Sequence, residues 1–227
     1  TVVYDVGPRY PSGFNTADAV VLPYLRTANI RHVDTLIISH ADNDHIGGLS
    51  ALIDQISVGE ILTSRPDKIV GAKECRRGQS WTARGVDFSV LSPETHTPEG
   101  SNNRSCVVRI EFGNVRVLLT GDIEKQVENF LLDSNVDLAA DIMLVPHQGS
   151  KTSSTEAFIN AVAPKLGLIA AGYQNQYGHP HPDVVNRYRD RAIALLSTQN
   201  SGSIRIHLSE SSWRITEFRK RHPRPWR

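Results

Sequence analysis

Two histidines and two aspartates fall within one short stretch, HADNDH, at residues 40–45. Imidazole nitrogens and carboxylate oxygens bind divalent cations, and carboxylates this close together would repel one another without a cation. The stretch follows the apolar run DTLIIS and leads into Gly47-Gly48, where glycine lets the backbone turn into a helix. This pattern predicts a metal site rather than a solvated acidic loop with incidental histidines. Its candidate ligands are His40, Asp42, Asp44 and His45.

Three later segments also carry chemically capable side chains where an apolar strand is expected to end. Asp122 follows VRVLLTG, His147 follows DIMLVP, and His179 and His181 follow LGLIAAGYQNQYG. Each has an ordinary alternative, since Asp122 could cap the next helix and the histidines could lie on the surface. Because the ends of neighbouring strands share one rim of a sheet, the four segments together predict a catalytic edge.

Side chains that could hold a phosphate follow the third of these segments. Ser150 and Lys151 lead into a helix start rich in serine and threonine, where backbone amides favour an anion. The alternative is an ordinary capped turn. Arg187, in the basic stretch NRYRDR, could follow a nucleic-acid backbone or could belong to a solvated helix face.

The elements that must position these residues alternate along the chain. Gly113-Asn114 separates two strand-like runs and predicts a hairpin. Such alternation indicates an α/β protein in which helices cover sheets. Strands are expected at 1–7, 33–40, 58–64, 85–93, 105–113, 114–122, 140–147, 165–172, 193–197 and within 203–217, and helices at 16–29, 46–56, 123–132, 153–164 and 182–191.

Composition limits the classes of protein that this chain can belong to. With 227 residues, 39% of them hydrophobic and 22% charged, it can bury the core of one large domain or two small ones. A net charge of +1 excludes a polycation, so any contact with nucleic acid must come from local patches. No apolar run approaches the length of a membrane helix, and no membrane insertion is expected. The chain opens on a strand with no leader, as a fragment or a processed protein would.

The two cysteines, Cys75 and Cys106, include no C-x-x-C pair. They could form one disulfide in an oxidising compartment or remain two buried thiols. The sequence alone slightly favours the thiols.

Taken together, the strings YDVG, SHADNDHIGG, NNRSCVVRIEFG, LLTGDIE, VPHQGSKTSS and GYQNQYGHPHPDVV resemble the metallo-β-lactamase fold superfamily. More closely, they resemble the C-terminal hydrolase domain of ComEC proteins, the inner-membrane channel proteins of natural DNA transformation. The likeness runs over nearly the whole chain. It implies an αββα sandwich, with two mixed sheets flanked by helices and the first strand of the fold missing. The expected domain covers residues 1–218, followed by a basic, flexible tail at 219–227.

The resemblance also implies a set of ligands for two divalent metal ions. His40 and Asp42 would hold the first ion, Asp44, His45 and His179 would hold the second, and Asp122 would bridge them. Two positions depart from the superfamily pattern: Asp42 replaces its usual histidine, and SNNRS stands where a further histidine is usual, which makes Asn102 or Asn103 a candidate weak ligand. A site richer in oxygen favours manganese or magnesium over tightly bound zinc, so the first site is expected to be weak or empty.

The implied activity is metal-assisted hydrolysis of a phosphodiester in DNA, on the strand that is not transported. Asp44 and Asp122 would activate the nucleophile. His147 would protonate the leaving oxygen, and Gln148 takes the place of a second histidine found in relatives. Ser150, Lys151 and Arg187 would contact phosphates.

The expected partners are single-stranded DNA and the channel portion of the same full-length protein. The domain would face the periplasm of a bacterium, and this placement favours the disulfide. Two alternatives remain open: a hydrolase of a small ester, lactone or phosphodiester, and a degenerate DNA-binding module.

Overall fold

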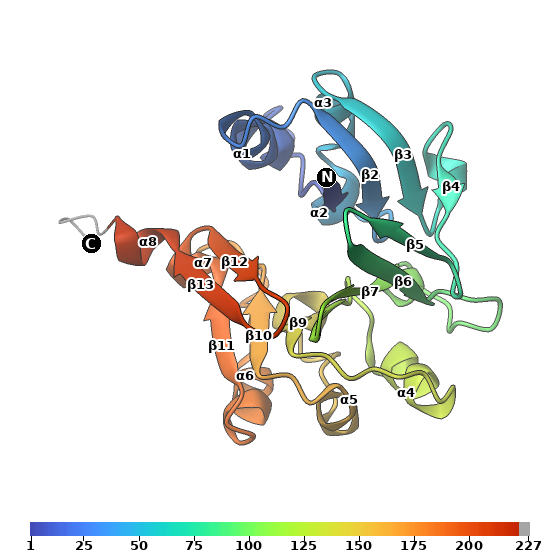
Figure 1. The fold of residues 1–227 in the computed structure, drawn as a ribbon, viewed down its shortest axis with the longest axis vertical. Coiled ribbons are helices and arrows are strands. Elements are labelled where there is room, and N and C mark those ends of the chain that lie inside the picture. Colours follow the sequence, from blue (N-terminus) through green and yellow to red (C-terminus); the bar gives the residue numbers. More distant parts are fainter. Residues whose placement is uncertain (223–227) are drawn as a thin grey trace. The chain divides into compact units, whose positions relative to one another are not determined.

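The structure is a computed structural model that describes residues 1–222, and the chain divides into two compact units (Figure 1). The first unit comprises Thr1–Arg77 and Ser92–Cys106. The second comprises Gly78–Leu91 and the chain from Val107 onward. The chain thus leaves the first unit, returns to it and leaves again, so neither unit is one continuous segment.

The first unit is built on a four-stranded sheet in the order β1-β2-β3-β4. Its strands pair in parallel, and the central strand β2 runs between β1 and β3. Leu36 and Ile38 of β2 are fully buried and pack with Leu22, Leu25 and Leu52 from the helices. The strands are β1 (Val2–Tyr4), β2 (His32–Ile38), β3 (Ser57–Thr63) and β4 (Lys73–Glu74).

Short helical segments accompany this sheet. The helix predicted at 16–29 is a π-helical turn that continues as α1, and the one predicted at 46–56 is divided between α2 and α3, around Gly47-Gly48. The segments are η1 (Ala17–Val21), α1 (Leu22–Thr27), α2 (Asn43–Ile46), α3 (Leu49–Ile53), η2 (Pro66–Lys68) and η3 (Asn102–Arg104).

The second unit contains a seven-stranded mixed sheet in the order β11-β10-β9-β8-β7-β6-β5. The pairs β5–β6 and β7–β8 are antiparallel, whereas β8, β9, β10 and β11 run parallel. The predicted Gly113-Asn114 hairpin is confirmed between β7 and β8. The strands are β5 (Ser80–Ala83), β6 (Val86–Ser92), β7 (Val107–Phe112), β8 (Val115–Leu119), β9 (Ile142–Leu144), β10 (Leu166–Ile169) and β11 (Ala194–Ser197).

Helices and a separate hairpin complete the second unit. Its core buries Leu131, Met143, Phe158, Ile169 and Tyr188. The elements are α4 (Lys125–Asp133), η4 (Pro146–Gly149), α5 (Glu156–Val162), α6 (Pro182–Arg189), α7 (Thr198–Ser201), β12 (Ile204–Leu208), β13 (Trp213–Glu217) and α8 (Phe218–Arg221).

These observations confirm the α/β class that the alternating pattern predicted. Within residues 1–222, no helix has the length and apolar character needed to cross a membrane. The predicted boundary at residue 218 stays a prediction. Helix α8 covers the beginning of the predicted tail, and residues 223–227 lie outside the described part of the chain.

The cysteines are joined rather than free. A disulfide links Cys75 to Cys106 within the first unit, with their Cα atoms 6.0 Å apart. The preference for two buried thiols that the sequence alone gave is therefore wrong. The sequence left the pairing open because the residues lie 31 positions apart, and only the fold brings them together.

Candidate metal centre

The carboxyl ends of β1 and β2 bring the first group of candidate ligands to one edge of the first sheet. Tyr4 lies opposite Ile37 in the parallel pairing, and the backbone N–H of Asp5 donates to the Ile37 carbonyl at 2.8 Å. Ser39 and His40 follow β2 directly and are fully buried. Asp5 and His40 therefore leave adjacent strands at the same edge.

Asp5 fixes the orientation of His45. Its Oδ2 lies 2.8 Å from His45 Nδ1, and its carboxylate also accepts hydrogen bonds from the N–H and hydroxyl of Ser39, at 2.7 and 2.8 Å. Because a carboxylate accepts and does not donate, Nδ1 of His45 carries the proton of this contact, which in the neutral imidazole leaves the lone pair on Nε2. This is the arrangement by which proteins orient a histidine that ligates a metal through Nε2.

His40 lies against His45, with the ring centroids 4.1 Å apart. Nε2 of His40 is 3.6 Å from Asp42 Oδ2, and Nε2 of His45 is 3.6 Å from Asp44 Oδ2. These separations are too long for hydrogen bonds but suit two ligands of one cation. Two imidazoles and two carboxylates within one loop form a donor set that fits a divalent metal ion.

Asp42 is held by a side chain that the sequence did not single out. The Ser101 hydroxyl donates to Asp42 Oδ1 at 2.5 Å. Of the two asparagines considered as weak ligands, Asn103 is buried and donates to the Glu99 carbonyl at 2.9 Å. Asn102 begins η3, and its role as a ligand stays a prediction. Ser105 of the same SNNRS segment lies with its Oγ 3.4 Å from His40 Nδ1, so two serines of this segment contact predicted ligands.

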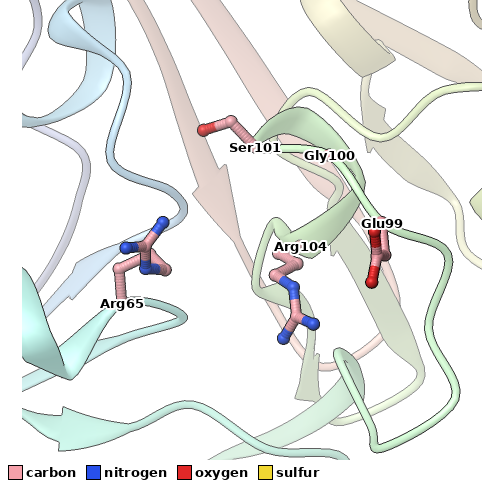
Figure 2. A pocket seen from close by; sticks show the side chains of 5 residues that line it. All are labelled: Arg65, Glu99, Gly100, Ser101 and Arg104. Carbon is pink, nitrogen blue, oxygen red and sulfur yellow. The ribbon is translucent and has the colours of Figure 1, made fainter.

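A small pocket opens beside Ser101, with a volume of about 240 Å³ (Figure 2). Arg65 approaches it from the loop after β3, and Arg104 comes from η3. The Arg65 guanidinium is held by both carboxylate oxygens of Asp67, at 2.7 and 2.8 Å. The remaining lining residues are Glu99 and Gly100.

The second group of candidate ligands lies at a strand edge of the second unit. Strands β8 and β9 are parallel, and the N–H of His147 donates to the Gly121 carbonyl at 3.1 Å. Asp122 is buried, and its Oδ2 lies 3.7 Å from His147 Nε2. On the other side of the ring, Nδ1 lies 3.2 Å from Thr152 Oγ1 and 3.7 Å from Glu124 Oε1. The structure thus brings the predicted Asp122 and His147 together.

The backbone around His147 is strained. His147 and Gln148 have φ angles of 50° and 53°, in the left-handed region that residues other than glycine rarely adopt. Each such residue costs about 1–3 kcal/mol, and such strain concentrates at functional sites. The turn keeps the imidazole of His147 beside Asp122.

His179 joins this group through its loop. Its ring centroid lies 5.8 Å from that of His147 and 5.8 Å from that of Tyr177. Asn175 holds the loop, because it accepts from the N–H of His179 at 2.9 Å and donates to the His179 carbonyl at 2.6 Å. His181 instead caps α6, where its Nδ1 accepts from the Asp183 N–H. Asp122, His147 and His179 therefore form a local group in the second unit.

The residues predicted to contact phosphate make structural contacts here. Ser150 is buried, with its hydroxyl 3.1 Å from that of Thr152. Lys151 is exposed and lies 3.4 Å from Asp183. Nη1 of Arg187 donates to the carbonyls of residues 153 and 154. Their roles towards DNA stay predictions.

Sequence reasoning missed Asp5, Ser39 and Ser101 as residues that position the ligands. Asp5 carries the same signal that identified His40, because it ends an apolar strand immediately before a turn with a glycine. Ser39 and Ser101 carry no distinguishing signal, since serine is frequent in loops.

Comparison with known proteins places the chain in a family. A family model described as Metallo-beta-lactamase superfamily matches residues 1–173. The chain belongs to this superfamily. Competence protein ComA of Neisseria gonorrhoeae is 35% identical over 204 residues, which are 89% of this chain and 29% of that protein. Recombination protein 2 of Haemophilus influenzae is 32% identical over 227 residues, which are 99% of this chain and 28% of that protein.

The chain therefore spans less than a third of the length of these relatives. The predicted resemblance to competence proteins is confirmed.

Among solved structures, the metallo-beta-lactamase fold protein YhfI of Bacillus subtilis superposes with a TM-score of 0.53 over 86% of this chain and 83% of that protein. Its sequence identity is 14%, so this similarity supports the fold alone.

Proposed function

We propose that this superfamily member is a metal-dependent phosphodiesterase that cleaves DNA. The observation that carries the proposal is the contact between Asp5 and His45, which fixes the tautomer that a metal ligand requires.

The proposed centre holds two divalent ions, manganese or zinc, with magnesium as a further candidate. His40 and Asp42 would hold one ion, Asp44, His45 and His179 would hold the other, and Asp122 would be a further ligand. The carboxylate at position 42 favours manganese at the first, weaker site. Bound divalent ions supply an acidified water and neutralise charge on the phosphoryl oxygens.

The residues of the chain perform the remaining steps. Asp44 and Asp122 orient the attacking water and accept its proton. His147 donates a proton to the leaving oxygen, a role supported by the Thr152 hydroxyl near its Nδ1. Ser150 and Lys151 hold the non-bridging oxygens, and Arg187 contacts the DNA backbone.

The names of the relatives support a role in competence. We propose that the domain acts on the DNA strand that is not transported during natural transformation. In this proposal it belongs to a longer inner-membrane protein, faces the periplasm and works beside the channel portion of that protein. Its substrate is single-stranded DNA.

A cleavage assay tests the proposal. Labelled single-stranded DNA is incubated with the protein in manganese, magnesium or zinc, with a chelator control. Cleavage is expected in at least one metal. It should fall by about 100-fold or more in Asp44→Ala and Asp122→Ala, because each removes a ligand and a proton acceptor. The matched control is Asp133→Ala, an exposed aspartate at the end of α4.

Two outcomes would contradict the proposal. If DNA binds but is never cut in any metal, the chain is a degenerate binding module. If only small esters, lactones or phosphodiesters are hydrolysed, the chain acts on a different class of substrate.

A further inference from the structure

A short loop at residues 8–16 places two aromatic rings on the surface of the first unit. Tyr10 and Phe14 are 50% and 55% exposed, and their ring centroids lie 5.7 Å apart at an angle of 48°. A tight turn presents them: the Gly13 N–H donates to the Tyr10 carbonyl at 2.9 Å, and the Tyr10 N–H donates to the Phe14 carbonyl at 2.8 Å. Pro11 and Gly13 suit the second and fourth positions of such a turn. The rings are therefore held by the loop's own backbone.

This aromatic loop is fastened to the segment that carries the candidate metal ligands. The Asn43 side-chain amide donates to the Arg9 carbonyl at 3.0 Å, and its oxygen lies 3.4 Å from the Arg9 N–H. Asn43 stands between Asp42 and Asp44 in the sequence. A Cβ at Gly47 would lie 2.4 Å from the Arg9 nitrogen, so only glycine permits this approach. The two rings are thus anchored beside the predicted ligands.

The loop also carries a positive charge. Arg9 is exposed, and its guanidinium makes no ion pair with any of residues 1–222. Nucleobases stack on aromatic rings, and the phosphates between them pair with a guanidinium. In a duplex the faces of the bases are already stacked on each other, so only a single strand offers them.

We propose that the aromatic loop binds single-stranded nucleic acid, with Tyr10 and Phe14 stacked on bases and Arg9 paired with a phosphate. The inference rests on the proposed function for placing the strand at the metal ligands. The binding itself needs no metal, so it can be measured in a chelator, apart from cleavage.

The first experiment measures fluorescence anisotropy of a labelled short oligothymidylate in a chelator. Tyr10→Ala and Phe14→Ala should each weaken binding by roughly five-fold or more, because each removes one stacking platform. Tyr10→Phe keeps the ring and should bind as the wild type does. Tyr24→Ala is the matched control, since Tyr24 is also 50% exposed but lies on α1. Thermal melting of each variant verifies that it is folded.

The second experiment uses only the wild-type protein and therefore does not depend on the folding of a variant. An abasic oligonucleotide of the same length keeps every phosphate but offers no base. It should bind the wild-type protein at least five-fold more weakly than oligothymidylate does, because neither ring then has a base to stack on. A separate salt titration tests the charge: Arg9→Ala should lower the slope of log K against log salt by about 0.7, the value for one phosphate contact on a single strand.

Three results would overturn the inference. The first is that no single strand binds, and the second is that abasic and normal strands bind with equal affinity. The third is that the alanine variants no longer bind anionic vesicles but bind DNA as the wild type does. The last result would assign the loop to a membrane surface. Failure of the proposed function looks different, because DNA would then bind through the loop in chelator and remain uncut in every metal.

Discussion

Oδ2 of Asp5 lies 2.8 Å from Nδ1 of His45, although 40 positions separate them in the chain. We predict that Asp5→Asn weakens metal binding by about 10- to 100-fold, the usual cost of losing a carboxylate that orients a ligating histidine. The asparagine should keep the local backbone, because Asp5 has a φ of 59° and asparagine tolerates this region well. Titration with manganese and with zinc against a competing chelator measures the affinity.

Asp54→Asn serves as the control for that measurement, since Asp54 is exposed and lies at the end of α3. It should leave both affinities unchanged. Wild-type affinity in Asp5→Asn would show that the contact with His45 does not serve a metal ion.

Metal preference should respond to the aspartate at position 42. We predict that Asp42→His raises the affinity for zinc by about 10-fold or more and lowers that for manganese, because an imidazole nitrogen replaces a carboxylate oxygen. The side chain is 46% exposed, so the larger ring can be accommodated. Competition between the two metals, read by elemental analysis of the recovered protein, measures the change.

Asp42→Asn separates ligand type from charge, because it keeps an oxygen and removes the negative charge. This variant should lower the affinity for both zinc and manganese without reversing which of the two binds more tightly. An unchanged preference in Asp42→His would mean that residue 42 is not a ligand.

Much of the candidate site could be predicted because ligands at strand ends leave a local signal. His40 and Asp122 each follow a strand at the expected place, and the segment around His147 also begins where its strand ends. The apolar runs of those strands are long enough to specify a strand, and the edge of the sheet follows from parallel pairing.

Other features depended on contacts that no local pattern encodes. The register between β1 and β2 decides that Asp5 meets His45, and a loop conformation decides that Ser101 bonds to Asp42. The division into two units also escaped prediction, because Ser92–Cys106 returns to the first unit after a strand of the second. Such long-range choices are made by packing of the whole chain rather than by residue propensity.

The disulfide should make a large contribution to stability. Cys75 and Cys106 enclose a loop whose ends are 31 positions apart, and closing such a loop lowers the entropy of the unfolded chain. The loss expected for Cys75→Ser with Cys106→Ser is about 3.5 kcal/mol of unfolding free energy. Denaturant unfolding of the wild type and the double variant measures it. Two titratable thiols in unreduced, denatured wild-type protein would contradict the pairing.

A buried carboxylate in the second unit should make stability depend on pH. Glu128 of α4 is fully buried and accepts hydrogen bonds from the backbone N–H groups of Ser154 and Thr155, at 2.5 and 2.7 Å. Burial raises the pKa of Glu128 above its usual value of 4.5, and the two N–H groups oppose that shift only in part. The folded protein therefore binds this proton at a higher pH than the unfolded chain does.

The sign of the effect follows from that difference. Between the raised pKa and 4.5 the folded state holds more protons, so its stability increases as the pH falls. We predict that acidification from about pH 7 to about pH 5 raises the unfolding free energy of the wild type relative to that of Glu128→Gln, because the glutamine cannot titrate. Urea unfolding across this range measures the difference. Glu156→Gln, at a side chain 71% exposed, should show no such trend. A constant difference between wild type and Glu128→Gln, or one of opposite sign, would show that Glu128 is ionised throughout.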